Sequence, residues 1–254
     1  MRPIAIFQHE ATQGPGVLRN HLERNDIPYR IIFPAAEKKF SFSARGFGGV
    51  VVLGSDHCAN EALGWIDQEQ HFLQDAIGRD IPILGHCFGA QMMARAMGAS
   101  VRKNLYANIG WGDVWVSPAA QQAMGLPAHA TIFNWHYDTF DIPPGAVRTM
   151  MGSHCRNKGF RYGRHWAFQG HLEVTEAGIA NWCRAGRQEL LQASGPAAQS
   201  EASILAAMPR HLPVLHQIAR SAYQAWMEQL DRPRVFSFGG PMRPLTRLRM
   251  AWPG

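Results

Sequence analysis

The segment IPILGHCFGAQ, residues 81–91, decides how the whole chain is interpreted. Its apolar start, Ile81 to Leu84, is typical of a buried strand, and the residues after the segment favour a helix. The pattern G-x-C-x-G at the junction is the thiol counterpart of the nucleophile elbow, a sharp strand-to-helix turn that exposes its central side chain above a sheet. We therefore expect Cys87 at the apex of a tight turn, at the carboxyl end of a strand.

Short apolar runs alternate with helical patterns on both sides of this segment. They predict an α/β fold, a three-layer open and mostly parallel sheet with helices on both faces. Between residues 111 and 170, turn-rich stretches separate short runs, and we expect antiparallel strands there. From residue 175 onward the pattern is helical, over 176–191, in a run with Ile204 and Leu205, and over 214–230. The expected strands are 4–7, 29–33, 50–53, 81–84, 114–116, 147–151 and 166–169.

The position expected for Cys87 favours nucleophilic chemistry. A helix N-terminus presents unpaired N–H groups and a positive dipole end, which favour the thiolate. The N–H of Phe88 could bind an oxygen of the substrate, as the residue after the nucleophile does in elbow enzymes. The alternative is that Cys87 is a small buried residue at an ordinary strand–helix junction. Cys58, Cys155 and Cys183 lack this setting, and we expect them to be structural or surface thiols.

A thiol nucleophile needs a base, and His171 is the best-placed of the 12 histidines. It follows the strand-like run WAFQ and precedes Glu173 by two residues, so both side chains would project to one side and the carboxylate could orient the imidazole. Taken alone, such a pair also fits a structural histidine. His86 adjoins Cys87, and we expect it to line the site rather than to act as the base. No metal-ligand spacing and no complete nucleotide-binding motif occurs, so neither a metal nor a cofactor is expected.

Length, composition and charge exclude several other classes of protein. The chain has 254 residues and a formal net charge of +6, much of it carried by five arginines in residues 231–254, and no basic stripe that would indicate nucleic-acid binding. We find no apolar run long enough to span a membrane and no signal peptide. Four widely spaced cysteines fit a reducing compartment, which predicts a cytoplasmic protein.

Together the motifs resemble a known family. GHCFGAQ (85–91) and QGHLE (169–173) resemble the G-x-C-x-G-x-Q and H-x-E motifs of class I glutamine amidotransferases. LGS (53–55) resembles the family's glycine-rich oxyanion strand, IGW (109–111) its I-G-W segment, and NWHYDT (134–139) its H-x-D stretch. The resemblance covers about residues 1–190 and is greatest to stand-alone members similar to the glutaminase part of GMP synthases.

The resemblance implies a flavodoxin-like fold and a Cys-His-Glu triad. Cys87 would attack the side-chain amide of glutamine, and His171, held by Glu173, would protonate the departing ammonia. Water would then hydrolyse the thioester. The other residues that the resemblance assigns are Phe88 with Gly54 or Ser55 as oxyanion donors, and Gln91, His136 and Asp138 as the lining for the amino-acid end of the substrate.

Three features depart from the family pattern. Ser55 and Asp56 stand where many members have a second glycine and a proline, and a side chain at Ser55 would restrict the peptide flip that such loops use. Leu172 replaces the proline of the usual Q-F-H-P-E motif, and Asn108 stands where many members have an acid.

We divide the chain into an amidotransferase-like domain (1–190), a helical extension packed on it (191–230) and an arginine- and proline-rich tail (231–254). The expected function is release of ammonia from glutamine, and a candidate acceptor of the ammonia is a separate synthase subunit. Hydrolysis of γ-glutamyl peptides by the same triad is the alternative, and a non-catalytic stress or regulatory protein is a further one. A homodimer is left open.

Overall fold

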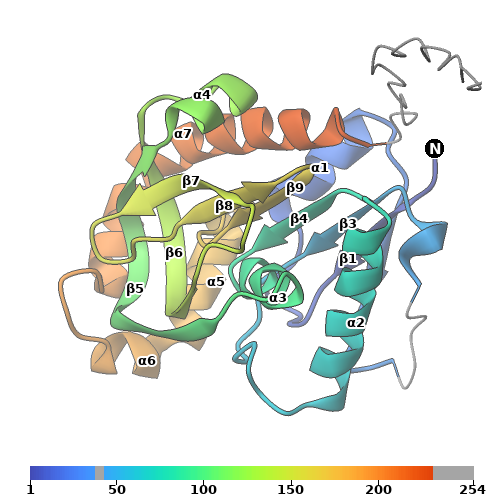
Figure 1. The fold of residues 1–254 in the computed structure, drawn as a ribbon. Coiled ribbons are helices and arrows are strands. Elements are labelled where there is room, and N and C mark those ends of the chain that lie inside the picture. The colour runs from blue at the N-terminus through green and yellow to red at the C-terminus, as the bar shows by residue number, and fades with distance from the viewer. Residues whose placement is uncertain (38–42, 231–254) are drawn as a thin grey trace, which may run out of the picture.

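A single sheet organises the molecule in the computed structural model, which describes residues 1–37 and 43–230 (Figure 1). Over these residues the sheet has nine strands in the order β2-β1-β3-β4-β9-β8-β7-β5-β6. Neighbouring strands from β2 to β9 are parallel, and those from β9 to β6 are antiparallel. The strands are β1 (Ile4–Phe7), β2 (Tyr29–Ile32), β3 (Gly49–Val52), β4 (Ile83–His86), β5 (Val101–Val116), β6 (His129–Phe140), β7 (Val147–Gly152), β8 (Gly159–Tyr162) and β9 (His165–Phe168).

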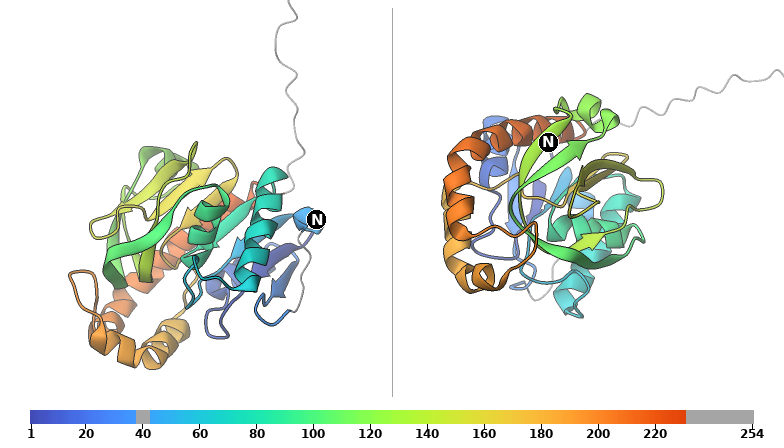
Figure 2. Two further views of the ribbon diagram at one scale, coloured as in Figure 1. Left: turned by 60° about the horizontal axis from the view of Figure 1, so that its bottom comes forward. Right: turned by 90° about the vertical axis from the view of Figure 1, so that its left-hand side faces the viewer.

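Helices cover both faces of this sheet, which confirms the predicted α/β class (Figure 2). Alternate residues of β1 supply two separate cores, because successive side chains of a strand point to opposite faces. Ile4 and Ile6 pack against one helix layer, and Ala5 and Phe7 pack against the other. The first layer contains α1 (Gly16–Arg24), α4 (Pro118–Met124), α5 (Glu176–Ala185), α6 (Arg187–Gln192) and α7 (Glu201–Met227), and the second contains α2 (Gly64–Gly78) and α3 (Phe88–Ala96).

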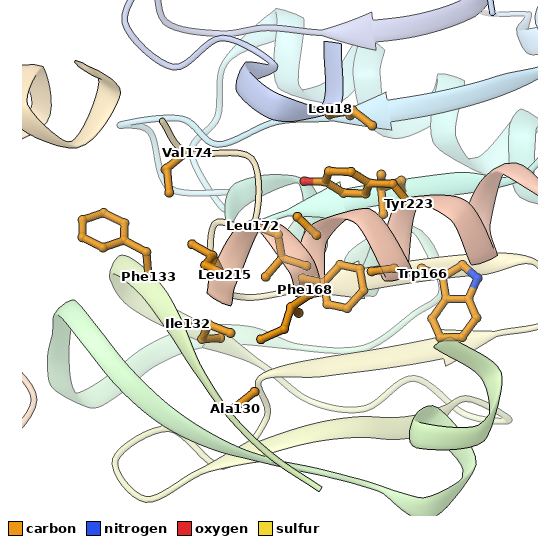
Figure 3. Packing of buried hydrophobic residues seen from close by; sticks show 14 of the residues in the cluster. Leu18, Ala130, Ile132, Phe133, Trp166, Phe168, Leu172, Val174, Leu215 and Tyr223 are labelled. Carbon is orange, nitrogen blue, oxygen red and sulfur yellow. The ribbon is translucent and has the colours of Figure 1, made fainter. Parts of the chain in front are cut away.

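The C-terminal helix α7 packs on one face of the sheet, against β9 and residues 172–174 that follow it. Leu215 and Tyr223 of α7 lie in one buried cluster with Phe168 and Leu172 (Figure 3). We predicted a helical run at Ile204 and Leu205 and a further one over 214–230, but α7 is one helix that is continuous across two prolines. A proline normally disrupts a helix interior. Here the packing of a buried apolar stripe offsets the cost of the two prolines. The stripe runs through the same region and contains Ile204, Met208, Leu212 and Leu215.

The antiparallel half differs most from the sequence prediction. Strand β5 begins at Val101, well before the predicted 114–116, and no strand was predicted for most of β6. Many residues of β5 are exposed or half-buried, so it lacks the apolar runs that mark the parallel strands. The predicted helix 176–191 is divided into α5 and α6 at Gly186, where a side chain would meet the Trp135 ring.

None of the described helices has the length and apolar character required to cross a bilayer. The arginine- and proline-rich tail, 231–254, lies outside the described residues.

Candidate active site

The turn expected at Cys87 is present between β4 and α3. Cys87 has φ +50° and ψ −110°, a conformation that costs a residue with a side chain on the order of 1–3 kcal/mol. The flanking glycines permit the close packing of this turn: a Cβ at Gly89 would overlap the Val52 carbonyl, and one at Gly85 would lie 2.8 Å from the Gly89 carbonyl. The backbone N–H of Cys87 donates to the Phe168 carbonyl at 2.8 Å, so β9 helps to fix the turn.

His171 lies beside Cys87 on the neighbouring strand end. Its Nδ1 is 2.7 Å from Oε1 of Glu173, and both side chains are buried. Its backbone N–H donates to the Phe133 carbonyl at 2.8 Å, an approach that requires Gly170, because a Cβ there would lie 2.9 Å from the same oxygen. The close pairing of β6 with this segment therefore leaves no room for a side chain at residue 170.

The electrostatics of this group favour a protonated imidazole. Burial acts to lower the pKa of His171, but the Glu173 charge, the Cys87 sulfur and their hydrogen bonds outweigh it and raise the pKa to about 10. Burial acts to raise the pKa of Glu173, but His86 and His171 outweigh it and lower that pKa. The carboxylate therefore stays ionised beside the ring.

His86 does not line the site, which corrects the sequence expectation. It is fully buried on the far side of Glu173, with Nδ1 3.4 Å from Oε2 of that carboxylate. Its Nε2 is 3.2 Å from the hydroxyl of Tyr223 on α7. Because Nδ1 faces a carboxylate, it carries the ring proton, and Nε2 accepts from Tyr223. Helix α7 thus contacts His86, which lies behind Glu173.

One cavity of about 490 Å³ opens over Cys87 and His171. The three predicted substrate residues, Gln91, His136 and Asp138, all line it, as do Ser55 and Phe88. His136 Nδ1 donates to the Asp138 backbone carbonyl at 2.9 Å, and Asp138 Oδ1 is 3.1 Å from Lys103 Nζ. Gly54 lies against the imidazole, since a Cβ there would be 2.8 Å from Cε1 of His171.

Sequence reasoning missed much of the cavity wall. Cys58, expected to be structural or a surface thiol, lies on this wall, and its pKa is raised by burial and by Asp138. The Trp182 ring meets the His171 ring edge-on at 4.8 Å. No local pattern marks these residues, because they come from loops and helices far apart in the chain. The other lining residues that we did not predict include Gln13, Lys103, Trp135, Tyr137 and Glu189.

A buried lysine supports the wall from the antiparallel half. Lys158 Nζ is 2.8 Å from His136 Nε2, 2.8 Å from Asn108 Oδ1 and 2.7 Å from Asn134 Oδ1. Burial lowers the pKa of Lys158 to about 8. The Lys158 ammonium donates to all three of these neutral groups. Because His136 Nε2 accepts one of these bonds, the proton of the His136 ring lies on Nδ1. In residues 1–37 and 43–230, no group of three histidine, cysteine or acidic side chains could hold a metal ion.

Comparison with known proteins decides the family. The model of the family described as glutamine amidotransferase class-I matches residues 20–178. The chain belongs to this family. The amidotransferase resemblance seen in the sequence motifs is therefore confirmed.

Solved and curated relatives agree with this assignment. The crystal structure of a glutamine amidotransferase from Methylobacillus flagellatus is 31% identical, has a TM-score of 0.88, and covers 92% of this chain and 97% of that one. A subunit of the glutamine-hydrolyzing GMP synthase of Thermoplasma acidophilum is 30% identical over 51% of this chain and 64% of its own length. Gamma-glutamyl peptidase 3 of Arabidopsis thaliana is 26% identical over 51% of this chain and 56% of its own length.

Proposed function

We propose that this class I amidotransferase domain is a cysteine-dependent amidohydrolase that releases ammonia from glutamine through a γ-glutamyl thioester. One observation carries the proposal: Cys87, on a strained turn, shares a cavity with an imidazole that is hydrogen-bonded to a buried carboxylate. This is the arrangement of nucleophile, base and orienting group that acyl transfer requires. Cys87, His171 and Glu173 are the proposed triad.

The first half-reaction forms the thioester. The Cys87 thiolate attacks the amide carbon of glutamine, a C–S bond forms, and the carbonyl oxygen becomes an oxyanion. The imidazolium of His171 donates its Nε2 proton to the amide nitrogen, the C–N bond breaks, and ammonia leaves. Glu173 stabilises the imidazolium before this transfer, as the acid of a catalytic triad does. Phe88 and the 54–55 segment supply N–H groups for the oxyanion.

The second half-reaction hydrolyses the thioester. His171, now neutral, accepts a proton from water through Nε2, and the resulting hydroxide attacks the thioester carbon. The C–S bond breaks, glutamate leaves, and the thiolate and imidazolium are restored. Gln91, His136 and Asp138 are proposed to bind the amino-acid end of the substrate, since all three line the cavity beside the nucleophile.

Hydrolysis of γ-glutamyl amides with a larger leaving group is the second candidate. The cavity, about 490 Å³, falls within the roughly 300–1,000 Å³ typical of small-molecule sites. Trp135 and Trp182 also supply an apolar wall close to His171, where the leaving group would depart. The relative named as a gamma-glutamyl peptidase supports this candidate.

The partner and compartment belong to the same proposal. The relative named as part of a GMP synthase supports transfer of ammonia to a separate synthase subunit, with release to solvent as the alternative. All four cysteines are free, which supports a reducing, cytoplasmic setting.

The proposal is tested by measuring ammonia release from glutamine and amino-acid release from γ-glutamyl dipeptides under the same conditions. The purified chain is given glutamine and γ-glutamyl dipeptides, and the ratio of their kcat/KM values assigns the substrate class. Cys87→Ala is expected to abolish both activities. Cys183→Ala is the matched control, because Cys183 is a buried thiol on α5 outside the cavity wall. A folded wild-type chain that turns over neither substrate contradicts the proposal and favours a regulatory protein.

A further inference from the structure

The peptide bond between Gly54 and Ser55 is held from outside the cavity by a buried ion pair. His9, just after β1, has Nδ1 3.0 Å from the Gly54 carbonyl oxygen. Its Nε2 is 2.9 Å from Oε2 of Glu69 on α2. The two side chains are only 2% and 0% exposed. Both ring nitrogens face atoms that can only accept, so both carry protons and His9 is an imidazolium.

The pKa of His9 agrees with the assignment of His9 as an imidazolium. Burial acts to lower the pKa of His9, but the Glu69 carboxylate and the Gly54 carbonyl outweigh it, and the pKa is raised. His9 therefore keeps donating to the Gly54 carbonyl. Charge-assisted hydrogen bonds of this kind are about twice as strong as neutral ones.

The orientation of the carbonyl determines that of the next N–H. In a trans peptide the two groups point in opposite directions, so the Ser55 N–H is turned away from His9. Ser55 lines the cavity with Cys87, whereas His9 does not. Among the described residues the Ser55 N–H has no hydrogen-bond acceptor. A backbone donor without a partner beside a nucleophile is the feature of an oxyanion hole.

Side-chain contacts hold the same loop from its other end. The Ser55 hydroxyl donates to Oε1 of Glu10 at 3.2 Å and accepts from the His57 N–H at 3.2 Å. This hydroxyl is thus engaged within the loop. The His9 ring also meets the ring of Phe88 edge-on at 4.8 Å, so it contacts the residue that offers the other proposed oxyanion N–H.

We propose that His9 and Glu69 are positioning residues that lock the Gly54–Ser55 peptide with the Ser55 N–H facing the oxyanion. This inference rests on the proposed function. It assigns the second oxyanion donor to Ser55 rather than Gly54. A peptide held in one orientation needs no freedom to rotate, so the proposed oxyanion hole does not require the second glycine found in many family members.

Glu69→Gln is the direct test. The substitution keeps the shape but removes the charge, so His9 becomes neutral and its hydrogen bond to the Gly54 carbonyl is no longer charge-assisted. We expect kcat for glutamine to fall several-fold in Glu69→Gln and roughly 10- to 100-fold when the His9 donor itself is removed, less than the about 10²–10³-fold cost of deleting an oxyanion donor outright. We expect KM to stay within about twofold, because the substrate carbonyl becomes an oxyanion only in the reaction. His9→Leu/Glu69→Leu is the second variant, since an apolar replacement of a buried pair usually preserves folding.

Alkylation of Cys87 by iodoacetamide distinguishes a misplaced oxyanion donor from a general distortion of the site around Cys87. This displacement forms no oxyanion, so its rate should be unchanged in both variants while kcat falls. Asp67→Asn is the matched control, because Asp67 is an exposed carboxylate on the same helix, and it should alter neither rate. Unchanged kcat in folded variants overturns this inference alone, as does a parallel loss of alkylation and kcat. A wild-type chain that releases no ammonia overturns the proposed function and this inference with it.

Discussion

The parallel and antiparallel halves of the sheet carry different parts of the site. Cys87 and His171 follow β4 and β9, two adjacent parallel strands. His136 and Asp138 lie on β6, in the antiparallel half, with Lys158 behind them. In the proposed mechanism, the parallel half positions the reacting atoms through backbone turns, whereas the antiparallel half forms the wall proposed to bind the substrate. Changes in the first should therefore affect kcat, and changes in the second should affect KM.

The largest effect is expected in the parallel half, from His171→Asn. Loss of the proton donor and acceptor should lower kcat for glutamine on the order of 10²–10⁴-fold, the usual contribution of a general acid and base. KM should change little. Steady-state kinetics of ammonia release provides the measurement. A kcat within a few fold of the wild type would assign the base to another residue.

Lys158→Met tests the antiparallel half. The substitution leaves the acceptors of Asn108, Asn134 and His136 without their shared donor, so the free energy of unfolding should fall by about 1–3 kcal/mol. Because His136 lines the cavity, KM should rise more than kcat falls. Urea denaturation and kinetics of the same preparation measure both. A loss of kcat at constant KM would contradict the assignment of substrate binding to the antiparallel half.

The pH dependence of stability tests the His171–Glu173 pair. The pKa of His171 is raised from 6.5 to about 10 in the folded chain, so the stabilisation from this pair is fully present below pH 6.5 and is lost as the pH rises towards 10. The difference in free energy of unfolding between the wild type and His171→Asn should therefore shrink over this range. Groups that do not interact with His171 cancel in the difference. A difference that stays constant with pH would mean that His171 is neutral in the folded chain.

The smallest effect is expected from Tyr223→Phe. It removes one hydrogen bond to His86, worth about 1 kcal/mol, and should lower kcat by a few fold through a less firmly held Glu173. Tyr29→Phe is the matched control, because the Tyr29 hydroxyl donates to Glu23 at 2.8 Å on the surface, away from the cavity. Equal kcat in the two variants would show that α7 contributes packing only.

The sequence predicts the parallel half and its turn because these follow local rules. Apolar runs end at glycines, and G-x-C-x-G specifies the strained turn at Cys87 without reference to distant residues. The proposed site residues line one cavity, apart from Gly54 and Glu173. Gly170 is explained only by the approach of β6, and a sequence alone does not reveal that contact.

The groups that the sequence analysis missed depend on long-range packing. Lys158 is surrounded by residues 22 to 50 positions away, and a single lysine in a turn-rich stretch usually indicates a solvated side chain. His86 was expected in the cavity, but the turn sends it behind Glu173, towards a tyrosine 137 positions later. Cys58 reaches the cavity wall through a loop that carries no pattern.

The identity of the nucleophile is tested most directly by labelling the native protein with a chloroketone analogue of glutamine, followed by peptide mapping. Two free thiols, Cys87 and Cys58, line the cavity, so the modified peptide discriminates between them. We predict modification at Cys87 alone, slowed by glutamine and absent in Cys87→Ser. Labelling of Cys58, or labelling of Cys87 that glutamine does not slow, would contradict the account.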